Sequence, residues 1–219
     1  MNGVVPVGTY VRDLGASIER LFENALDWEH LPHVHAGSFA GISLIEAGPA
    51  GWRAEAILPD GRPILLDLAL DRAAGRWVTR TWVDERLASE IVSDAVTTGA
   101  DHCRVSVEFR AADVAGESRS AVGEYYRRLY AALYDEDERL MIARAEAVKR
   151  GPKALKERRS VILADGSVHA MPLYCPHQGL PLDAEPDPDG IVTCPWHSYR
   201  FDLRTGACVS GQACGWTRA

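Results

Sequence analysis

The sequence predicts an α+β chain in which a long helix grips an antiparallel sheet, followed by a small all-β module. Three patterns carry this prediction: short alternating segments between residues 39 and 109, a long amphipathic segment at residues 120–150, and a short hairpin pattern near the C-terminus. Successive strands joined by short turns favour antiparallel pairing with one buried face. The predicted domains are residues 1–151 and residues 152–219.

The first element is predicted to be a helix that begins after Ser17, whose hydroxyl can cap it. Its apolar positions follow helical spacing and are Ile18, Leu21, Phe22, Leu26 and Leu31. Pro32 lacks a backbone N–H, so we expect the helix to break or kink just before His33 and His35.

The next region alternates apolar and polar residues, as strands with one buried face do. The alternating segments are residues 52–58, 63–66, 76–83, 90–92 and 104–109. The turn sequence at residues 59–62, Pro-Asp-Gly-Arg, separates the first two segments and predicts a hairpin.

A long helix is predicted at residues 120–150, with Lys149 and Arg150 complementing its C-terminal dipole and Gly151 ending it. Its core-facing positions are expected to be Val122, Tyr125, Tyr126, Leu129, Leu133, Leu140 and Met141. Beyond a basic linker, residues 160–164 and 167–173 flank an Asp-Gly turn and predict another hairpin.

Composition excludes several classes of protein. The 219 residues are 47% hydrophobic and 25% charged, as in ordinary globular proteins, and the net charge of -7 argues against a nucleic-acid partner. No apolar run is long enough to span a membrane, and no signal peptide is visible, so we expect a cytoplasmic protein. Cys103, Cys208 and Cys214 are expected to be thiols in a reducing cytosol, with a Cys208–Cys214 pair as the alternative.

Two short loops near the C-terminus each offer one Cys and one His. Cys175 and His177 are followed, after sixteen residues, by Cys194 and His197. Two thiolates and two imidazoles suit a Rieske-type [2Fe–2S] cluster, in which His replaces Cys on one iron and raises the reduction potential. The alternative is a Cys2His2 zinc site, but zinc fingers usually pair Cys with Cys and His with His.

A second constellation follows the first predicted helix. Asn24, Asp27 and His30 are three residues apart and share one helix face, and the break at Pro32 lets His35 turn back toward them. Two imidazoles and one carboxylate form the facial triad of non-heme Fe(II) oxygenases. The acidic run at residues 135–138, on the long helix, is a candidate source of the carboxylate.

Both ends of the chain resemble Rieske non-heme iron oxygenases, the ring-hydroxylating and demethylating family. The N-x2-D-x2-H-x4-H segment matches the family's mononuclear iron motif, and residues 194–206 are similar to Rieske ferredoxins and oxygenase Rieske domains. The sheet with its long helix resembles the helix-grip, START-like fold.

The resemblance implies roles for individual residues. His30, His35 and Asp137 would hold a mononuclear Fe(II), with Asp135 the alternative to Asp137. Asp27 would be the carboxylate that links the iron to the Rieske cluster, and Asn24 would support it.

The chain departs from the family in three ways. Its domain order is inverted, both parts are short, and Ser198 stands where a Gly commonly follows the second His. Because few residues follow Cys208, residues 4–11 are a candidate strand for closing the small module.

The resemblance further implies an oxidoreductase, a mono- or dioxygenase, that inserts oxygen from O2 into a small apolar substrate, aromatic or alicyclic. We expect the substrate cavity to be lined by Phe39, Ile42, Leu44, Trp52, Trp77, Trp82, Tyr126 and Tyr130. No dinucleotide-binding motif is visible, so a separate NAD(P)H-dependent reductase, and a ferredoxin in some arrangements, would supply the electrons. The resemblance also implies an oligomer, expected to be a trimer. Two alternatives remain open, a Rieske electron-transfer protein and a START-like ligand binder without oxygenase activity.

Overall fold

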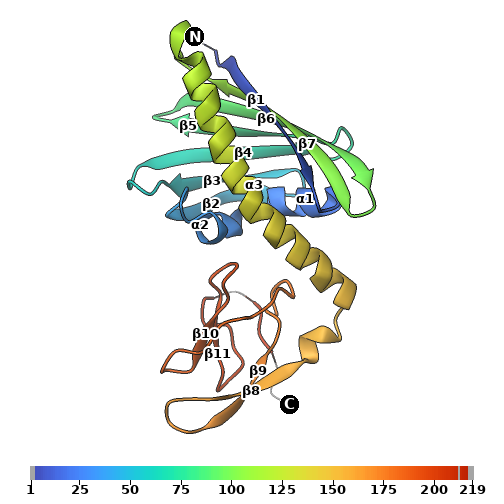
Figure 1. Cartoon of the computed structure of the whole chain (residues 1–219). Helices are drawn as coiled ribbons and strands as arrows, with labels where there is room; N and C mark the ends of the chain where they lie inside the picture. Colours follow the sequence, from blue (N-terminus) through green and yellow to red (C-terminus); the bar gives the residue numbers. More distant parts are fainter. Residues whose placement is uncertain (1–2, 212, 217–219) are drawn as a thin grey trace. The chain divides into compact units, whose positions relative to one another are not determined.

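The computed structural model describes residues 3–211 and 213–216 and divides the chain into two compact units, Met1–Met141 and Ile142–Ala219 (Figure 1). The division lies inside the long helix α3, Arg119–Arg150, and not at its C-terminal end. The reason is local: Arg144 Nη1 donates to Gln178 O at 2.6 Å, and the Arg150 guanidinium lies 4.2 Å from the centre of the Tyr174 ring. The last turns of α3 therefore belong to the second unit.

The first unit is built on a seven-stranded antiparallel sheet in the order β1-β7-β6-β5-β4-β3-β2. The strands are β1 (Val5–Leu14), β2 (Gly41–Gly48), β3 (Gly51–Ile57), β4 (Pro63–Asp71), β5 (Arg76–Val83), β6 (Arg86–Gly99) and β7 (His102–Ala111). The predicted hairpin at residues 52–66 is confirmed as β3 and β4, paired from Gly51↔Ala69 to Ile57↔Pro63.

Long helix α3 crosses this sheet, following the short 3-10 helix η2 (Gly116–Ser118), and Figure 1 shows it lying over the sheet. Gly123 of α3 approaches β1 so closely that an added Cβ would lie 2.1 Å from Val7 O. The prediction that Tyr125 faces the core is wrong, because Tyr125 is 58% exposed, whereas Tyr134 is buried. The helical face toward the sheet is thus rotated slightly from the predicted one.

The N-terminal helix is shorter than predicted. Helix α1 (Ile18–Leu26) begins after Ser17, whose hydroxyl accepts from Arg20 N, and ends well before Pro32. The 3-10 helix η1 (Trp28–His30) and the short helix α2 (Leu31–Val34) follow. Pro32 does not break a helix here, because it lies in the first turn of α2, where its missing N–H has no helical partner to lose.

The expectation that residues 4–11 complete the small module is wrong. They form most of β1, which pairs with β7 at the edge of the large sheet from Val5↔Ala111 to Leu14↔Cys103. Tyr10 of β1 also stacks on Tyr134 of α3, with ring centroids 6.1 Å apart. The strand therefore extends the large sheet, where its alternate residues pack beneath α3.

The second unit has short strands and its own core. Its elements are the end of α3, the 3-10 helix η3 (Ala154–Lys156), β8 (Arg158–Ile162), β9 (Val168–Pro172), β10 (Ile191–Thr193) and β11 (Arg200–Asp202). Strands β8 and β9 form the predicted hairpin, and β10 pairs with β11. Isolated bridges, including Phe201↔Cys208 and Ala207↔Gly215, add to this sheet structure. Buried side chains such as Met171, Phe201 and Leu203 form a core separate from that of the first unit.

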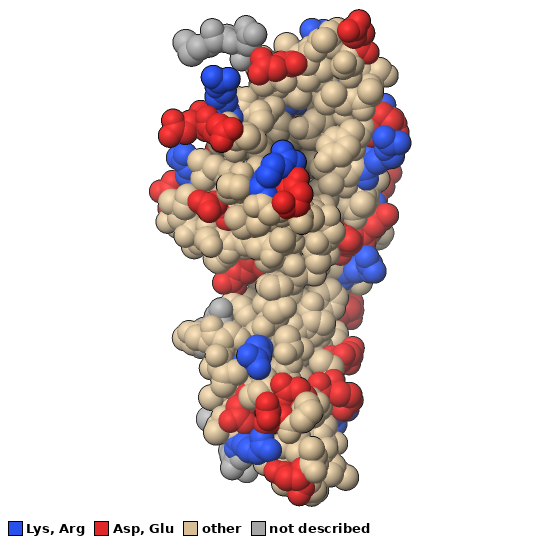
Figure 2. Space-filling view, turned by 90° about the vertical axis from the view of Figure 1, so that its left-hand side faces the viewer, with Lys and Arg blue, Asp and Glu red and all other residues tan. Residues whose placement is uncertain are grey.

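Exposed charges of both signs mix on the surface. On the face drawn in Figure 2, Lys and Arg side chains lie among Asp and Glu side chains. Neighbouring strands carry bidentate pairs such as Arg76–Asp94 and Arg104–Asp13, each with a nitrogen–oxygen distance of 2.7 Å. Exposed pairs of this kind contribute little to stability, so the cores determine the fold.

Candidate metal centres

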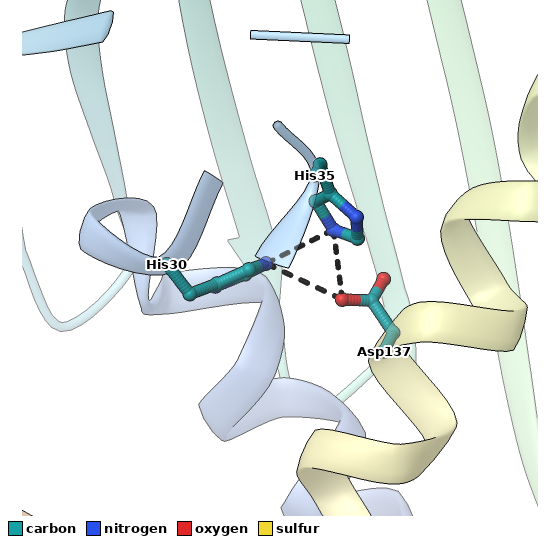
Figure 3. Close-up of side chains that lie close together, drawn as sticks. All are labelled: His30, His35 and Asp137. Carbon is teal, nitrogen blue, oxygen red and sulfur yellow. Dashed lines mark hydrogen bonds and ion pairs between the residues drawn. The ribbon is translucent and has the colours of Figure 1, made fainter. Parts of the chain in front are cut away.

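His30, His35 and Asp137 converge in the first unit (Figure 3). Nε2 of His30 lies 3.2 Å from Nε2 of His35, and Asp137 Oδ1 lies 3.3 Å and 2.9 Å from these two nitrogens. His30 closes η1, His35 caps α2, and Asp137 faces them from α3 (Figure 3). Two consecutive elements, η1 and α2, and the much later helix α3 therefore present three ligand atoms to one point.

The spacing of these atoms fits adjacent positions around a metal ion. For metal–ligand bonds of about 2.1 Å, ligands at right angles lie ~3.0 Å apart. All three separations lie close to this value, and the three side chains are buried or nearly so. Two neutral imidazoles and one carboxylate on one face leave other coordination positions open, as in non-heme Fe(II) sites.

Glu136 holds the second ring nitrogen of His35. Its Oε2 lies 2.7 Å from His35 Nδ1, so two consecutive residues of α3 contact the two nitrogens of one imidazole. Burial opposes protonation of His35, but hydrogen bonds with Asp137 and Glu136 raise its pKa above the ordinary value. Burial likewise opposes ionisation of Asp137, yet hydrogen bonds from His30 and His35 hold its pKa well below the ordinary value. The carboxylate is thus ready to bind a cation.

Asp135 is remote from this cluster. Its carboxylate lies 2.5 Å from Arg12 Nη1 on β1, and its side chain is 66% exposed. Glu138 also binds Arg12 and accepts from Gly15 N at 2.6 Å. Of the four acidic residues in the run, Asp137 and Glu136 face the histidines, while Asp135 and Glu138 join α3 to the N-terminal strand.

Asn24 and Asp27 lie on the approach to the same cluster. Asn24 is buried, and its Oδ1 has no hydrogen-bond partner within the described chain. Asp27 is half-buried and forms the C-cap of α1, where its N–H donates to Glu23 O and Asn24 O. Both residues line the cavity that reaches the two histidines and Asp137.

This cavity has a volume of about 620 Å³ and lies within the first unit. Of the predicted lining residues, Phe39, Trp52, Trp77, Tyr126 and Tyr130 do line it. Ile42, Leu44 and Trp82 do not, and Leu44 is 41% exposed. The sequence reasoning missed the hydroxyls of Thr79 and Thr81, which the alternation along β5 from Trp77 could have placed on the same face.

In the second unit, Cys175, His177, Cys194 and His197 come together. The two thiols are buried and hydrogen-bonded to each other, the imidazole centroids lie 4.9 Å apart, and the Nδ1 atom of each imidazole is buried. Hydrogen bonds from Cys175 and His197 hold the pKa of Cys194 below that of an ordinary thiol. Two sulfur and two nitrogen donors in one buried cluster fit a [2Fe–2S] centre with mixed ligands.

The two cluster loops have the same backbone design. Cys175 N donates to Leu180 O, and Gly179 N donates back to Cys175 O, at 2.7 and 2.8 Å. In the second loop Cys194 N donates to Tyr199 O, and Ser198 N donates to Cys194 O, at 2.8 and 2.9 Å. Gly179 and Ser198 occupy equivalent positions with φ of 72° and 53°. The requirement for a positive φ explains why glycine suits this position better than Ser198.

Among the described residues, no helix combines the length and apolar character needed to cross a membrane.

Comparison with known proteins identifies the second unit. Residues 138–217 match the family model of the Rieske [2Fe–2S] domain. The chain therefore carries a Rieske domain, and the [2Fe–2S] interpretation of Cys175, His177, Cys194 and His197 is favoured over a zinc site. No curated protein sequence matches the chain.

Solved structures resemble the first unit. The aromatase/cyclase Zhui from Streptomyces sp. R1128 is 14% identical, with a TM-score of 0.53, covering 68% of this chain and 98% of that one. A protein from Thermus thermophilus is 16% identical, with a TM-score of 0.50, covering 62% and 97%. A START superfamily protein from Mycobacterium smegmatis is 19% identical, with a TM-score of 0.48, covering 60% and 97%. The predicted fold class, a helix-grip START-like unit plus a Rieske domain, is confirmed.

Proposed function

We propose that the protein is a small Rieske-type non-heme iron oxygenase, a mono- or dioxygenase that inserts oxygen from O2 into an apolar substrate. The observation that supports it is the convergence of His30, His35 and Asp137 at an apolar cavity of about 620 Å³. A ligand-binding fold alone has no need of such a triad. A Rieske domain alone needs no cavity.

In this proposal each side-chain cluster holds one inorganic group. His30, His35 and Asp137 hold Fe(II), while Cys175, His177, Cys194 and His197 hold the [2Fe–2S] cluster. When bound, the cluster supplies single electrons and the ferrous ion supplies the site for O2.

The remaining residues orient ligands and exclude water. Glu136 accepts from His35 Nδ1–H, which fixes the tautomer that leaves Nε2 free to bind metal. The aromatic walls of the cavity exclude water from the substrate and keep it against the triad. Asp27, three residues before His30, is proposed as the carboxylate that links the iron site to a Rieske cluster through imidazole N–H groups, with Asn24 supporting it. The cluster in question belongs to the same chain or to a neighbouring subunit of a trimer.

Electrons have to come from another protein. We propose an NAD(P)H-dependent reductase, acting directly or through a ferredoxin, and a cytoplasmic location for the whole system. The chain itself has no Gly-rich dinucleotide-binding motif.

Iron analysis combined with oxygen uptake tests the proposal. The wild-type chain should contain about three iron atoms, two in the cluster and one in the triad. Asp137→Asn should lose about one iron and all substrate-dependent oxygen uptake while keeping the Rieske electron paramagnetic resonance signal. Asp135→Asn, on another side of the same helix, is the matched control and should keep the third iron atom and the oxygen uptake. Equal iron content in the two variants and the wild type would refute the proposal and favour a Rieske electron-transfer protein.

A START-like ligand binder is the second candidate, because the cavity suffices for a small apolar ligand with or without iron. It predicts tight ligand binding that Asp137→Asn leaves unchanged, with no oxygen uptake in any variant.

A further inference from the structure

We infer that the substrate is an aromatic molecule that carries a hydroxyl or carbonyl group and no carboxylate, and that Thr79 and Thr81 hydrogen-bond the hydroxyl or carbonyl group. The inference rests on the proposed function, because it treats the cavity beside His30, His35 and Asp137 as the substrate site. It adds a polar recognition point to a cavity whose walls are largely aromatic and aliphatic.

The walls of the cavity favour an aromatic ring. Trp52 and Trp77 contribute large apolar side chains from the sheet, and Tyr126 and Tyr130 contribute theirs from α3. Tyr126 and Tyr130 pack on Phe109, with ring centroids 5.4 and 5.0 Å away, so their positions are fixed by the core behind them. Rigid aromatic walls suit a ring that can stack on them or meet them edge-on.

Thr79 and Thr81 interrupt this apolar surface. Both lie on β5, two residues apart, and share the face of Trp77. Their cross-strand neighbours on β4 are Leu68 and Leu66, and both of these leucines also line the cavity. Two hydroxyls thus lie side by side in a strip of otherwise apolar positions.

The hydroxyls of Thr79 and Thr81 make no hydrogen bond to another residue of the described chain. Ser89, opposite Thr81 on β6, differs because it is hydrogen-bonded to Tyr126. A threonine is costly to leave unpaired inside a cavity, since its hydroxyl loses solvation when an apolar ligand enters. A ligand hydroxyl or carbonyl between the two threonines would restore the lost hydrogen bonds.

The charges of the cavity disfavour a carboxylate substrate. Arg62 is the only Lys or Arg among the described lining residues, and its side chain is 71% exposed and bound to Asp60 at 2.7 Å. Deeper in the cavity the ionisable lining groups are His30, His35, Asp137 and Asp27. An anionic substrate would lose its hydration there without a buried cationic side chain to replace it.

Equilibrium dialysis of the full chain against three compounds with one ring system tests the inference. The probes are naphthalene, 2-naphthol and 2-naphthoate. We expect 2-naphthol to bind about five- to tenfold more tightly than naphthalene, as one or two hydrogen bonds allow, and 2-naphthoate to bind more weakly than naphthalene. Thr79→Val/Thr81→Val should abolish the advantage of 2-naphthol and should not weaken the binding of naphthalene. Thr97→Val, the same change at an exposed position of β6, should have no effect.

An equal ratio of the 2-naphthol and naphthalene affinities in the wild type and the double variant would overturn the inference. So would binding of 2-naphthoate as tight as that of 2-naphthol. Dialysis needs neither a reductant nor O2, which separates this result from the proposed function. If the binding preferences hold while no oxygen is consumed, the substrate assignment stands and the proposal of oxygenase activity is refuted. If oxygen uptake depends on Asp137 but the preferences are absent, only the substrate assignment fails.

Discussion

At the scale of single residues, two neighbouring carboxylates of α3 contact different nitrogens of His35. Asp137 lies 2.9 Å from its Nε2 and Glu136 lies 2.7 Å from its Nδ1. Consecutive residues on a helix diverge by about 100°, so both reach one imidazole only because they contact different nitrogens of the ring. In the proposed metal site, Asp137 would share the metal ion with the ring, and Glu136 would orient the ring.

Glu136→Gln should therefore weaken metal binding without removing a ligand. The amide oxygen still accepts a hydrogen bond from His35 Nδ1–H. Because the amide is neutral, it no longer makes Nε2 of His35 a stronger metal ligand, so we expect about tenfold lower affinity for Co²⁺ at the triad. The affinity can be followed from the visible absorption of Co²⁺ after the mononuclear site has been stripped with a mild chelator. Asp135→Asn, which changes a carboxylate on the same helix that faces Arg12, is the control. Unchanged affinity in Glu136→Gln would show that Glu136 has no part in orienting His35.

Ser198 carries backbone strain that its counterpart Gly179 avoids. With φ of 53°, Ser198 lies in the left-handed region that a Cβ disfavours by about 1 kcal/mol. Ser198→Gly should stabilise the second unit by about this amount in chemical denaturation of the cluster-loaded protein. Ser198→Ala, which removes the hydroxyl but keeps the Cβ, should give no such gain. A loss of stability in Ser198→Gly would mean that the hydroxyl's own contacts outweigh the relief of strain.

At the scale of secondary-structure elements, the contact of α3 with β1 determines where the triad's carboxylate lies. Gly123 rests on the backbone of β1 near Val7, where β1 has an irregular register. Further along α3, Arg12 of β1 binds both Asp135 and Glu138, so these two acidic residues are held on the side that flanks Asp137. The close packing at one end and the ion pairs at the other fix the rotation of α3 about its axis.

Gly123→Ala should destabilise the first unit although alanine favours helices. An added Cβ would lie 2.1 Å from Val7 O, which is a backbone atom, so α3 or β1 has to move. We expect a loss of about 1–3 kcal/mol in the free energy of unfolding, monitored by tryptophan fluorescence. Gly116→Ala, where an added Cβ meets nothing within 4 Å, should leave stability nearly unchanged. Equal stabilities of the two variants would contradict the close approach.

At the scale of the whole molecule, two hydrophobic cores depend on different chemistry. The first contains residues of the sheet, α1 and α3, whereas the second includes Cys175 and Cys194 themselves. A small unit with few regular strands relies on its metal for stability, because its apolar core is limited. The first unit has a much larger core and does not include cluster ligands.

Removal of the cluster should therefore unfold the second unit selectively. After treatment with chelator and reductant, limited proteolysis should degrade residues beyond Met141 and leave a fragment that contains the seven-stranded sheet. Mass spectrometry of the fragment and its retained binding of 2-naphthol would identify it. Equal protease resistance before and after cluster removal would show that the second unit is stable without metal.

The correspondence between sequence and structure is best for features that depend on local pattern. Strand β5 matches its predicted bounds, and the N-cap at Ser17 and the end of α3 at Gly151 follow from capping chemistry. The rotation of α3 was less predictable, because Tyr125 and Tyr134 are both aromatic and only tertiary packing, such as the stacking of Tyr134 on Tyr10, decides which is buried. The place of β1 was missed for a similar reason, since the partner of an edge strand is remote in sequence.

The sequence by itself determined the chemical donors and their order along the chain: a helix with His30 and His35 after it, an acidic run about a hundred residues later, and two Cys–His loops near the C-terminus. These follow from residue identity and short-range spacing. Only the tertiary structure decided that Asp137 and Glu136, and not Asp135, face His35. The physical reason is that a helix presents successive residues to different sides, so the choice among them belongs to the contacts that hold α3 against the sheet.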